Sequence, residues 1–249
     1  MRRLAVAGVT IAAIAAGGSA AADAPQAQLK DFDCQHAVDP PARALQVTAV
    51  IRTLPGTRKL ELKFDLLRRI KGTPRFVAVH GHNLGTWLSP SDPTLGRVPG
   101  DTWELTKPVV NLPAPALYRF RVRFRWMGSH GHVIATDVKG SPTCYQPELR
   151  PDLLVQAITI QPPATPVGSY TYAAVIRNRG ATGAGPFDVQ LSLGPKTKTV
   201  QWLAPHSKRR VKFGGPACAS GSYVSVTVDP MGQADQYDQS NDTLTVACP

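Results

Sequence analysis

The chain has 249 residues, of which 28 are Lys or Arg and 17 are Asp or Glu, so its formal net charge at pH 7 is +11. This length allows one large domain or two of ordinary size. Pro and Gly contribute 44 residues, and no segment keeps a 3.6-residue apolar period, which excludes a helical bundle. No apolar run reaches the roughly 20 residues that a membrane-spanning helix needs.

The first 22 residues are predicted to be a secretory signal peptide. Met1–Arg3 is basic, Leu4–Ala16 is apolar, and Ala20–Ala22 supplies small residues for cleavage. This order of segments is typical of exported proteins. We therefore expect a secreted protein, extracellular or associated with the cell envelope. It should have no transmembrane anchor, and nucleic acid should not be its physiological partner.

Four cysteines follow this segment: Cys34, Cys144, Cys218 and Cys248. An even number in an exported protein, with no C-x-x-C spacing, favours two disulfides over metal ligands. Three pairings are possible. A chain that divides near residue 150 favours Cys34–Cys144 and Cys218–Cys248, with one bond in each half.

Short alternating runs of apolar and polar residues, separated by turn residues, predict β-strands throughout the chain. In the run 59–66, Leu60, Leu62, Phe64 and Leu66 face one way. Strands of the first half are predicted at residues 45–51, 59–66, 75–80, 102–109, 117–126 and 132–138. The segment 81–100 is predicted to be a loop with at most a short edge strand.

A polar, proline-bounded segment at residues 146–151 marks the predicted domain boundary. We expect a basic domain over residues 23–149 and a second domain over residues 150–249. Strands of the second domain are predicted at residues 153–160, 170–178, 187–193, 197–203, 208–213, 222–228 and 243–246. Short strands with no helix between them favour a sandwich. The expected fold is all-β, with two tandem immunoglobulin-like antiparallel β-sandwich domains.

Five short motifs occur in order along the second domain: Pro151–Val155, Val175–Gly180, Leu203–Pro205, Val226–Pro230 and Asp235–Asp242. Together they resemble the CARDB family, the cell-adhesion-related domain found in bacteria. Two positions depart from the family, because His206 replaces its usual Gly and Asp242 replaces the second of its two usual Asn residues. The resemblance implies a seven-stranded immunoglobulin-like sandwich in an extracellular, non-catalytic role. It brings no catalytic residues.

The basic character belongs to the first domain. Residues 23–150 contain 18 basic and 11 acidic residues, whereas residues 151–249 contain 8 basic and 6 acidic residues. Four arginines, Arg119, Arg121, Arg123 and Arg125, alternate with apolar residues along one predicted strand. With a two-residue period they line one face, about 6.6 Å apart. Guanidinium groups at this spacing suit sulfate, phosphate or uronate groups.

The alternative is a solvated strand face that acidic residues neutralise. Glu61 and Asp65 would be the partners if their strand were adjacent to the arginines. In an immunoglobulin-like order, however, the strand of Glu61 and Asp65, taken as the second, and the arginine strand, taken as the sixth when a short edge strand in 81–100 is counted, lie in different sheets. The neighbours of the arginine strand are then expected to be the strands around Val77 and Ile134, which offer only Asp137.

Two features could bind metal. His80-Gly81-His82 and His130-Gly131-His132 each present two imidazoles on one side of a strand, as Zn²⁺ or Cu²⁺ would require. The two runs are expected at opposite ends of a sheet, so we interpret them as turn histidines. The second feature is a loop with oxygen ligands suited to Ca²⁺, although their spacing is not that of an EF-hand: Asp229, Asp235, Asp238, Asn241 and Asp242. Turn formation by Asp and Asn is the simpler explanation.

Catalytic motifs such as G-x-S-x-G, H-E-x-x-H or a phosphate-binding glycine loop do not occur in the sequence. We expect no enzyme activity and no cofactor. The predicted function is that of a secreted, non-catalytic binding or adhesion protein. Its basic domain would contact an acidic cell-envelope polymer, a glycan or an extracellular protein. The alternative is an extracellular metal-binding protein that uses the histidine pairs or the Asp-rich loop.

Overall fold

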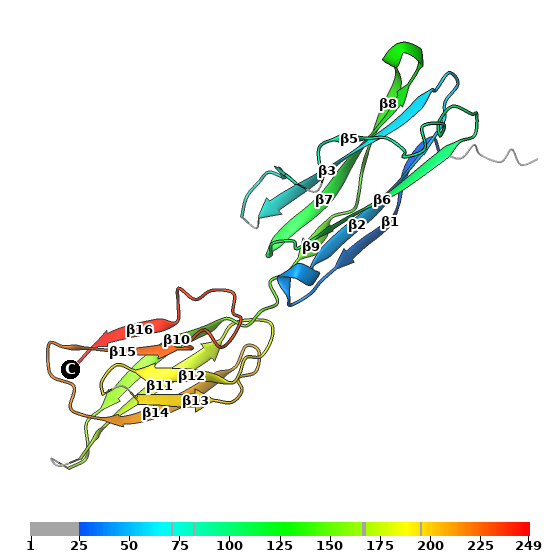
Figure 1. Ribbon diagram of the computed structural model, residues 1–249. Coiled ribbons are helices and arrows are strands. Elements are labelled where there is room, and N and C mark those ends of the chain that lie inside the picture. Colours follow the sequence, from blue (N-terminus) through cyan, green and yellow to red (C-terminus); the bar gives the residue numbers. More distant parts are fainter. Residues whose placement is uncertain (1–24, 71, 82, 166–167, 195) are drawn as a thin grey trace, which may run out of the picture.

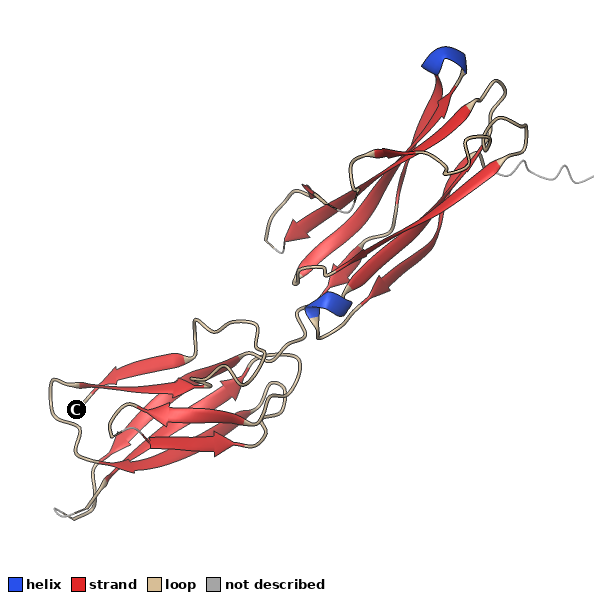
Figure 2. Ribbon diagram, in the orientation of Figure 1, coloured by secondary structure: helices blue, strands red, loops and turns tan. Residues whose placement is uncertain are grey.

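The computed structural model describes residues 25–249 except residues 71, 82, 166–167 and 195. The predicted signal peptide, residues 1–22, lies outside the described residues. Almost all regular structure is antiparallel β-sheet, and the two helical segments are short 3-10 turns, η1 (Pro40–Ala42) and η2 (Ser129–Gly131) (Figure 2). No helix in the described part of the chain is long and apolar enough to cross a membrane.

The first half of the chain forms two facing sheets (Figure 1). One sheet has the order β1-β2-β6, with strands β1 (Ala27–Gln35), β2 (Ala44–Arg52) and β6 (Thr102–Val110). The other follows the path β4-β3-β7-β8, while β5 pairs with β3 and β9 pairs with β7. Its strands are β3 (Lys59–Ile70), β4 (Val77–Val79), β5 (Trp87–Leu88), β7 (Ala116–Met127), β8 (Val133–Gly140) and β9 (Cys144–Gln146).

The second half repeats this topology. One sheet has the order β10-β11-β14, with strands β10 (Leu153–Gln161), β11 (Tyr170–Asn178) and β14 (Lys208–Gly215). The other has the order β13-β12-β15-β16, with strands β12 (Phe187–Leu191), β13 (Lys196–Val200), β15 (Tyr223–Val228) and β16 (Thr243–Ala247). In both halves the first, second and fifth main strands form one sheet, which is an immunoglobulin-like order.

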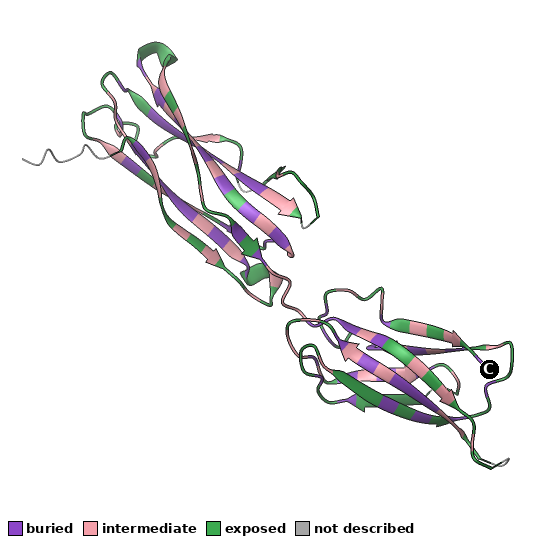
Figure 3. Ribbon diagram, turned by 180° about the vertical axis from the view of Figure 1, so that it is seen from behind, coloured by how far each residue is buried: buried purple, intermediate pink, exposed green. Residues whose placement is uncertain are grey.

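Each pair of sheets encloses its own hydrophobic core. One cluster of buried residues runs from Ala27 to Cys144, and the other runs from Leu153 to Cys248. Burial alternates along the strands, as the two-residue period requires (Figure 3). At an order-of-magnitude level, each large apolar side chain buried in this way contributes about 1.5–3 kcal/mol. Two separate cores therefore stabilise two sandwiches.

One disulfide ties each sandwich. Cys34 of β1 bonds to Cys144 of β9, with a Cα–Cα distance of 5.7 Å. Cys218 bonds to Cys248 after the last strand, with a Cα–Cα distance of 5.4 Å. This is the pairing that the sequence predicts, and no cysteine in the described chain is free.

The prediction that β3 and β7 lie in different sheets is wrong. They pair along their whole length, from Lys59 opposite Met127 to Ile70 opposite Ala116. Strand β1 is absent from the predicted strands, because a register shift between Lys30 and Asp33 breaks its alternation of apolar and polar residues. With β1 counted, β3 is the third main strand rather than the second, and the third strand is the one that pairs with the sixth. The strand around Val77 is β4, which pairs with β3 and not with β7.

Candidate anion-binding face

The arginines of β7 point away from the core. Phe120, Val122 and Phe124 have no exposed surface, so the residues between them lie on the outer face of the sheet. Arg119 is exposed, and the side chains of Arg121, Arg123 and Arg125 keep 44%, 38% and 25% of their accessible surface. The sequence predicted this direction from the two-residue period alone.

Acidic residues of β3 neutralise part of this strand. Glu61 lies opposite Arg125, and their side chains form an ion pair of 2.5 Å. Asp65 lies opposite Arg121 and bonds to it at 3.2 Å and to Arg123 at 3.4 Å. The two carboxylates that the sequence analysis named as conditional partners are therefore the actual ones.

The neutralisation is incomplete. We call the outer surface of β3 and β7 the basic face. It carries seven cations and two acids, which leaves five positive charges in excess: Lys59, Lys63, Arg69, Arg119, Arg121, Arg123, Arg125, Glu61 and Asp65. The neighbouring strand β8 places uncharged Thr136, Val138 and Gly140 opposite the arginines. The face is thus cationic overall, with its charges at regular intervals.

Two aromatic rings lie against the cations. The guanidinium of Arg125 is 3.9 Å from the ring centre of Trp87, and the ammonium of Lys63 is 6.0 Å from the same ring. The guanidinium of Arg119 lies 4.4 Å from the ring centre of Phe76. A stacked guanidinium keeps its N–H edge free for hydrogen bonds. Within the described chain, neither Arg119 nor Arg69 of this sheet face has a carboxylate partner, and Arg119 is the more exposed of the two.

Glu61 remains ionised in this setting. Burial opposes its ionisation, but hydrogen bonds from Lys59 and Arg125 outweigh burial and hold the pKa of Glu61 below its usual value. The ion pairs of Glu61 therefore persist at neutral pH, and they fix the orientation of Arg125 without removing the positive charge of the face.

A groove lies at one end of the basic face. It has a volume of about 370 Å³ and is lined by Arg69, Ile70, Gly72, Thr73, Ala116, Leu117 and Tyr145. Leu117 shares the outer side of β7 with the arginines, and Tyr145 pairs with it from β9. Tyr145 and Ile70 are each 46% exposed. The groove therefore places apolar side chains beside the cations of the basic face.

The two histidine runs do not meet. His80 follows Val79, which pairs with Leu66, whereas His130 follows Met127, which pairs with Lys59. Seven positions along β3 correspond to roughly 20 Å. His82 lies outside the described residues. His132 Nδ1 lies 2.7 Å from the carbonyl oxygen of Ser129 and belongs to the η2 turn.

The described chain holds one cluster of three potential metal ligands, Cys34, His36 and Cys144. Both cysteines are bonded to each other, so neither offers a thiolate. Of the three, only the imidazole of His36 is left as a potential ligand.

The carboxylates of the Asp-rich loop accept hydrogen bonds from nearby backbone N–H groups and side chains. The Oδ1 and Oδ2 atoms of Asp229 accept the backbone N–H groups of Gln233 at 2.7 Å and Ala234 at 2.9 Å. Asp238 accepts the backbone N–H of Ser240 at 2.9 Å and the side-chain amide of Asn241 at 3.1 Å. These bonds shape turns, as the structural interpretation of the loop requires.

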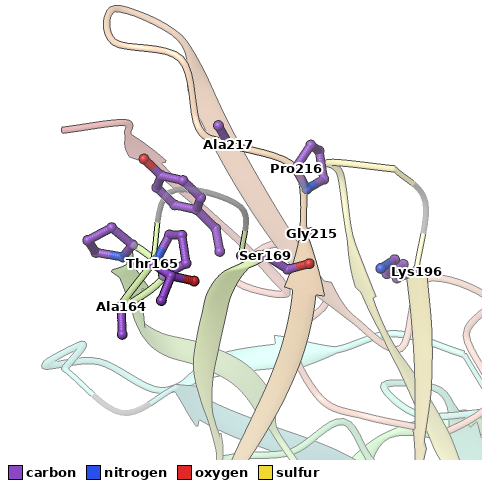
Figure 4. Close-up of a pocket in the computed structure, with 11 residues that line it drawn as sticks. Ala164, Thr165, Ser169, Lys196, Gly215, Pro216 and Ala217 are labelled. Carbon is purple, nitrogen blue, oxygen red and sulfur yellow. The ribbon is translucent and has the colours of Figure 1, made fainter.

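A cavity of about 790 Å³ lies at the far end of the second sandwich (Figure 4). Its wall is made mostly of Pro, Ala and Gly, with Thr165, Ser169, Tyr170 and Lys196 as the polar contributors. It is lined by no carboxylate and no histidine among the described residues, and it does not touch the basic face.

The motifs of the second domain have structural roles. Asn178 is fully buried, and its Oδ1 accepts the backbone N–H groups of Asp152 and Gly180 at 3.1 and 2.9 Å. Its Nδ2 donates to the carbonyl oxygen of Thr182 at 2.8 Å. His206, where the family usually has Gly, has a φ of +56°, a conformation that favours glycine.

Comparison with known families supports this domain. The family model described as CARDB matches residues 150–246. The second half of the chain is therefore a domain similar to CARDB, as the sequence motifs indicate, and the first half matches no family model. No curated protein gave a significant match.

Solved structures match the chain only weakly. Red sea bream transglutaminase matches with 14% identity and a TM-score of 0.31, over 91% of this chain and 32% of its own. The class 5 fimbriae chaperone CfaA matches with 12% identity and a TM-score of 0.29, over 90% of this chain and 99% of its own. Amycolatopsis orientalis exo-chitosanase CsxA matches with 15% identity and a TM-score of 0.27, over 87% and 26%. The chain thus spans about a third of the transglutaminase.

Sequence reasoning found the arginines but missed Trp87, Phe76, Lys63 and Arg69. Lys63 had a usable signal, because it alternates with the core residues of β3. Trp87 and Phe76 had none. They come from segments outside the long strands, and only tertiary pairing places them against the arginines.

Proposed function

We propose that this chain is an extracellular, non-catalytic binding protein that uses the basic face of its first domain to bind an anionic polymer. The observation that carries the proposal is the excess of five positive charges on one sheet face, at a regular spacing and beside two aromatic rings. Two disulfides favour an oxidising compartment. The domain similar to CARDB is compatible with an adhesion-type role.

Three features of the face favour binding. Successive arginines on β7 are about 6.6 Å apart, which allows several anionic groups of one polymer to be contacted at once. Ion pairs with Glu61 and Asp65 orient the arginines before binding, so less conformational entropy is lost. The groove beside Tyr145 and Leu117 gives the neutral part of a sugar a place next to the charges.

Retention on immobilised heparin across a NaCl gradient tests the proposal. The face variant, Arg121→Gln with Arg123→Gln, should elute at clearly lower salt than the wild type, since exposed charges are screened over about 10 Å at 0.1 M salt. A control variant of equal charge, Arg58→Gln with Arg97→Gln, changes exposed arginines of the same domain that line a different cavity. Equal elution of the face and control variants would show that the arginines form only a solvated strand face and do not bind the polyanion.

A further inference from the structure

The second domain contains a basic surface that its modest net charge conceals. Of its eight basic residues, six lie on two consecutive strands, β13 and β14: Lys196, Lys198, Lys208, Arg209, Arg210 and Lys212. All six are exposed. The strands are edges of two different sheets, and the Lys196 ammonium donates a 2.5 Å hydrogen bond to the carbonyl oxygen of Gly214. The two edges therefore meet. We call this surface the basic edge.

Its charges are not neutralised. None of the six cations has a carboxylate partner among the described residues. Asp188, the one acid on β12, accepts a 2.7 Å hydrogen bond from the Thr199 hydroxyl. The other five acids lie outside β13 and β14: Asp152, Asp229, Asp235, Asp238 and Asp242. Six cations are thus gathered on two strands without ion pairs to the described acids of the domain.

Protection of an exposed sheet edge is the simplest use of such charges, because lysines on edge strands prevent pairing with other chains. Lys196 and Lys198 fit that use, since they pair with the buried residues Leu191 and Val189 and so stand on the inner side of their strand. Lys208, Arg210 and Lys212 do not. They alternate with the buried Val211 and Phe213 on the outer side of β14.

The outer row also has the spacing of the basic face. Lys208, Arg210 and Lys212 occupy alternate positions of one strand, about 6.6 Å apart, as do the arginines of β7. Arg177 pairs with Lys208 from β11 and extends the row sideways. At the far end, Lys196 and Gly215 line the cavity of about 790 Å³ beside Tyr170 and Pro216 (Figure 4).

We propose that the basic edge is a second polyanion-binding surface, which binds the same linear anionic polymer, with repeating phosphate, sulfate or uronate groups, that the basic face binds. The chain would then contact one polymer at two points. Linking two weak sites in this way raises the overall affinity well above that of either site. This role of the basic edge rests on the proposed function of the basic face. The experiment below distinguishes failure of the basic edge from failure of the basic face.

The experiment compares three variants of the full chain on immobilised heparin: the edge variant, the face variant and their combination. The edge variant carries Lys208→Gln, Arg210→Gln and Lys212→Gln, all at exposed positions. We expect it to elute at lower salt than the wild type. The slope of log affinity against log salt should fall by about 2, since each cation on a flexible polyanion contributes about 0.7. The combined variant should elute earlier still.

A control with the same charge change, Lys30→Gln with Arg58→Gln and Arg97→Gln, lies on neither surface and should elute near the wild type. If the edge variant matches this control while the face variant is weakened, the second surface does not exist and the proposed function stands. If only the edge variant is weakened, the basic edge binds the polyanion alone, and both the proposed role of the basic face and the contact at two points are overturned. If neither is weakened, both proposals fail.

Two further measurements test whether the basic edge instead meets another copy of the chain or a lipid surface. Light scattering detects self-association: an edge variant that aggregates, with its monomer retained as strongly as the wild type, would show that the charges only protect the edge. Cosedimentation with phosphatidylglycerol vesicles tests a lipid surface. Binding to these vesicles without retention on heparin would overturn the assignment to a soluble polymer.

Discussion

Arg43 and Glu148, 105 residues apart in sequence, form a buried ion pair beside the junction of the two domains, with N–O distances of 2.8 and 3.3 Å. Arg43 is 1% exposed, and it also donates to the carbonyl oxygens of Ala37 and Val38. Glu148 accepts the backbone N–H of Arg150, whose side chain reaches Asp235 of the second domain at 3.2 Å. Four alternating charges therefore connect the first domain, the linker and the second domain.

Glu148→Gln should destabilise the protein by about 3–5 kcal/mol, because it leaves the buried guanidinium of Arg43 without its counter-charge. Urea denaturation at pH 7 measures the change. Asp235→Asn is the matched control, since the carboxylate of Asp235 is 74% exposed and its removal should cost less than about 1 kcal/mol. Equal stabilities of the two variants would show that the buried pair contributes no more than an exposed one.

Acid should remove this stabilisation. Burial opposes the ionisation of Glu148, but hydrogen bonds from Arg150 and Arg43 outweigh it and hold the pKa below its usual value of 4.5. A carboxylate with a lowered folded pKa stabilises the fold above its unfolded pKa and loses that contribution as pH falls through the folded one. The stability difference between wild type and Glu148→Gln should therefore be constant above about pH 5 and shrink below pH 4.5. A difference that does not change down to pH 3 would contradict this assignment.

Phe120→Ala should destabilise the first domain by roughly 3–5 kcal/mol, whatever the ligand. Phe120 has no exposed surface, and its ring meets that of Phe64 edge-on, with centroids 6.3 Å apart. Its neighbour Arg121 is on the outer face, and Asp65 keeps its ion pair with Arg123 when Arg121 is replaced, so Arg121→Gln should cost less than about 1 kcal/mol. Thermal unfolding of both variants measures this contrast. A similar loss in each would mean that the outer face contributes to the fold, and the heparin experiment would then need a different variant.

The sequence predicted those features that depend on local periodicity. Alternation placed β3 and β7, buried Phe120 and turned Arg121 outward. The partners on the basic face depend on which strands are neighbours, and that was predicted incorrectly. The bulge in β1, where Asp31 has a φ of +50°, hid one strand and moved Glu61 and Asp65 away from the arginines in the predicted topology.

The basic edge escaped the sequence analysis for a related reason. A net charge summed over the second domain cancels the cations of β13 and β14 against acids that lie on other segments. The run Lys208-Arg209-Arg210 is visible in the sequence, but its meeting with Lys196 is not. Only the packing of two different sheets against each other brings those strands together.

Asp242 is a buried acid at a position where the CARDB family usually has Asn. It is 8% exposed, and its Oδ2 accepts a 2.7 Å hydrogen bond from Gln236. Its Oδ1 is buried without a partner in the described part of the chain. Burial, together with repulsion from Asp229, raises the pKa of Asp242 to about 7. The folded protein therefore holds a proton on this carboxyl far more tightly than the unfolded chain does.

Because the pKa of Asp242 is raised, the stability of the second domain should decrease as pH rises. The folded state binds more protons than the unfolded state between pH 3.8 and about 7, so stability decreases across that window and stays low above it. Asp242→Asn removes the buried charge and should stabilise the second domain by about 1–3 kcal/mol at pH 8, with little change near pH 4. Calorimetric unfolding of wild type and variant at both pH values measures the effect, with Asp235→Asn as an exposed control from the same loop. A variant that is less stable than the wild type at pH 8 would show that the charged carboxylate of Asp242 is satisfied in the folded protein, and that its ionisation does not oppose folding.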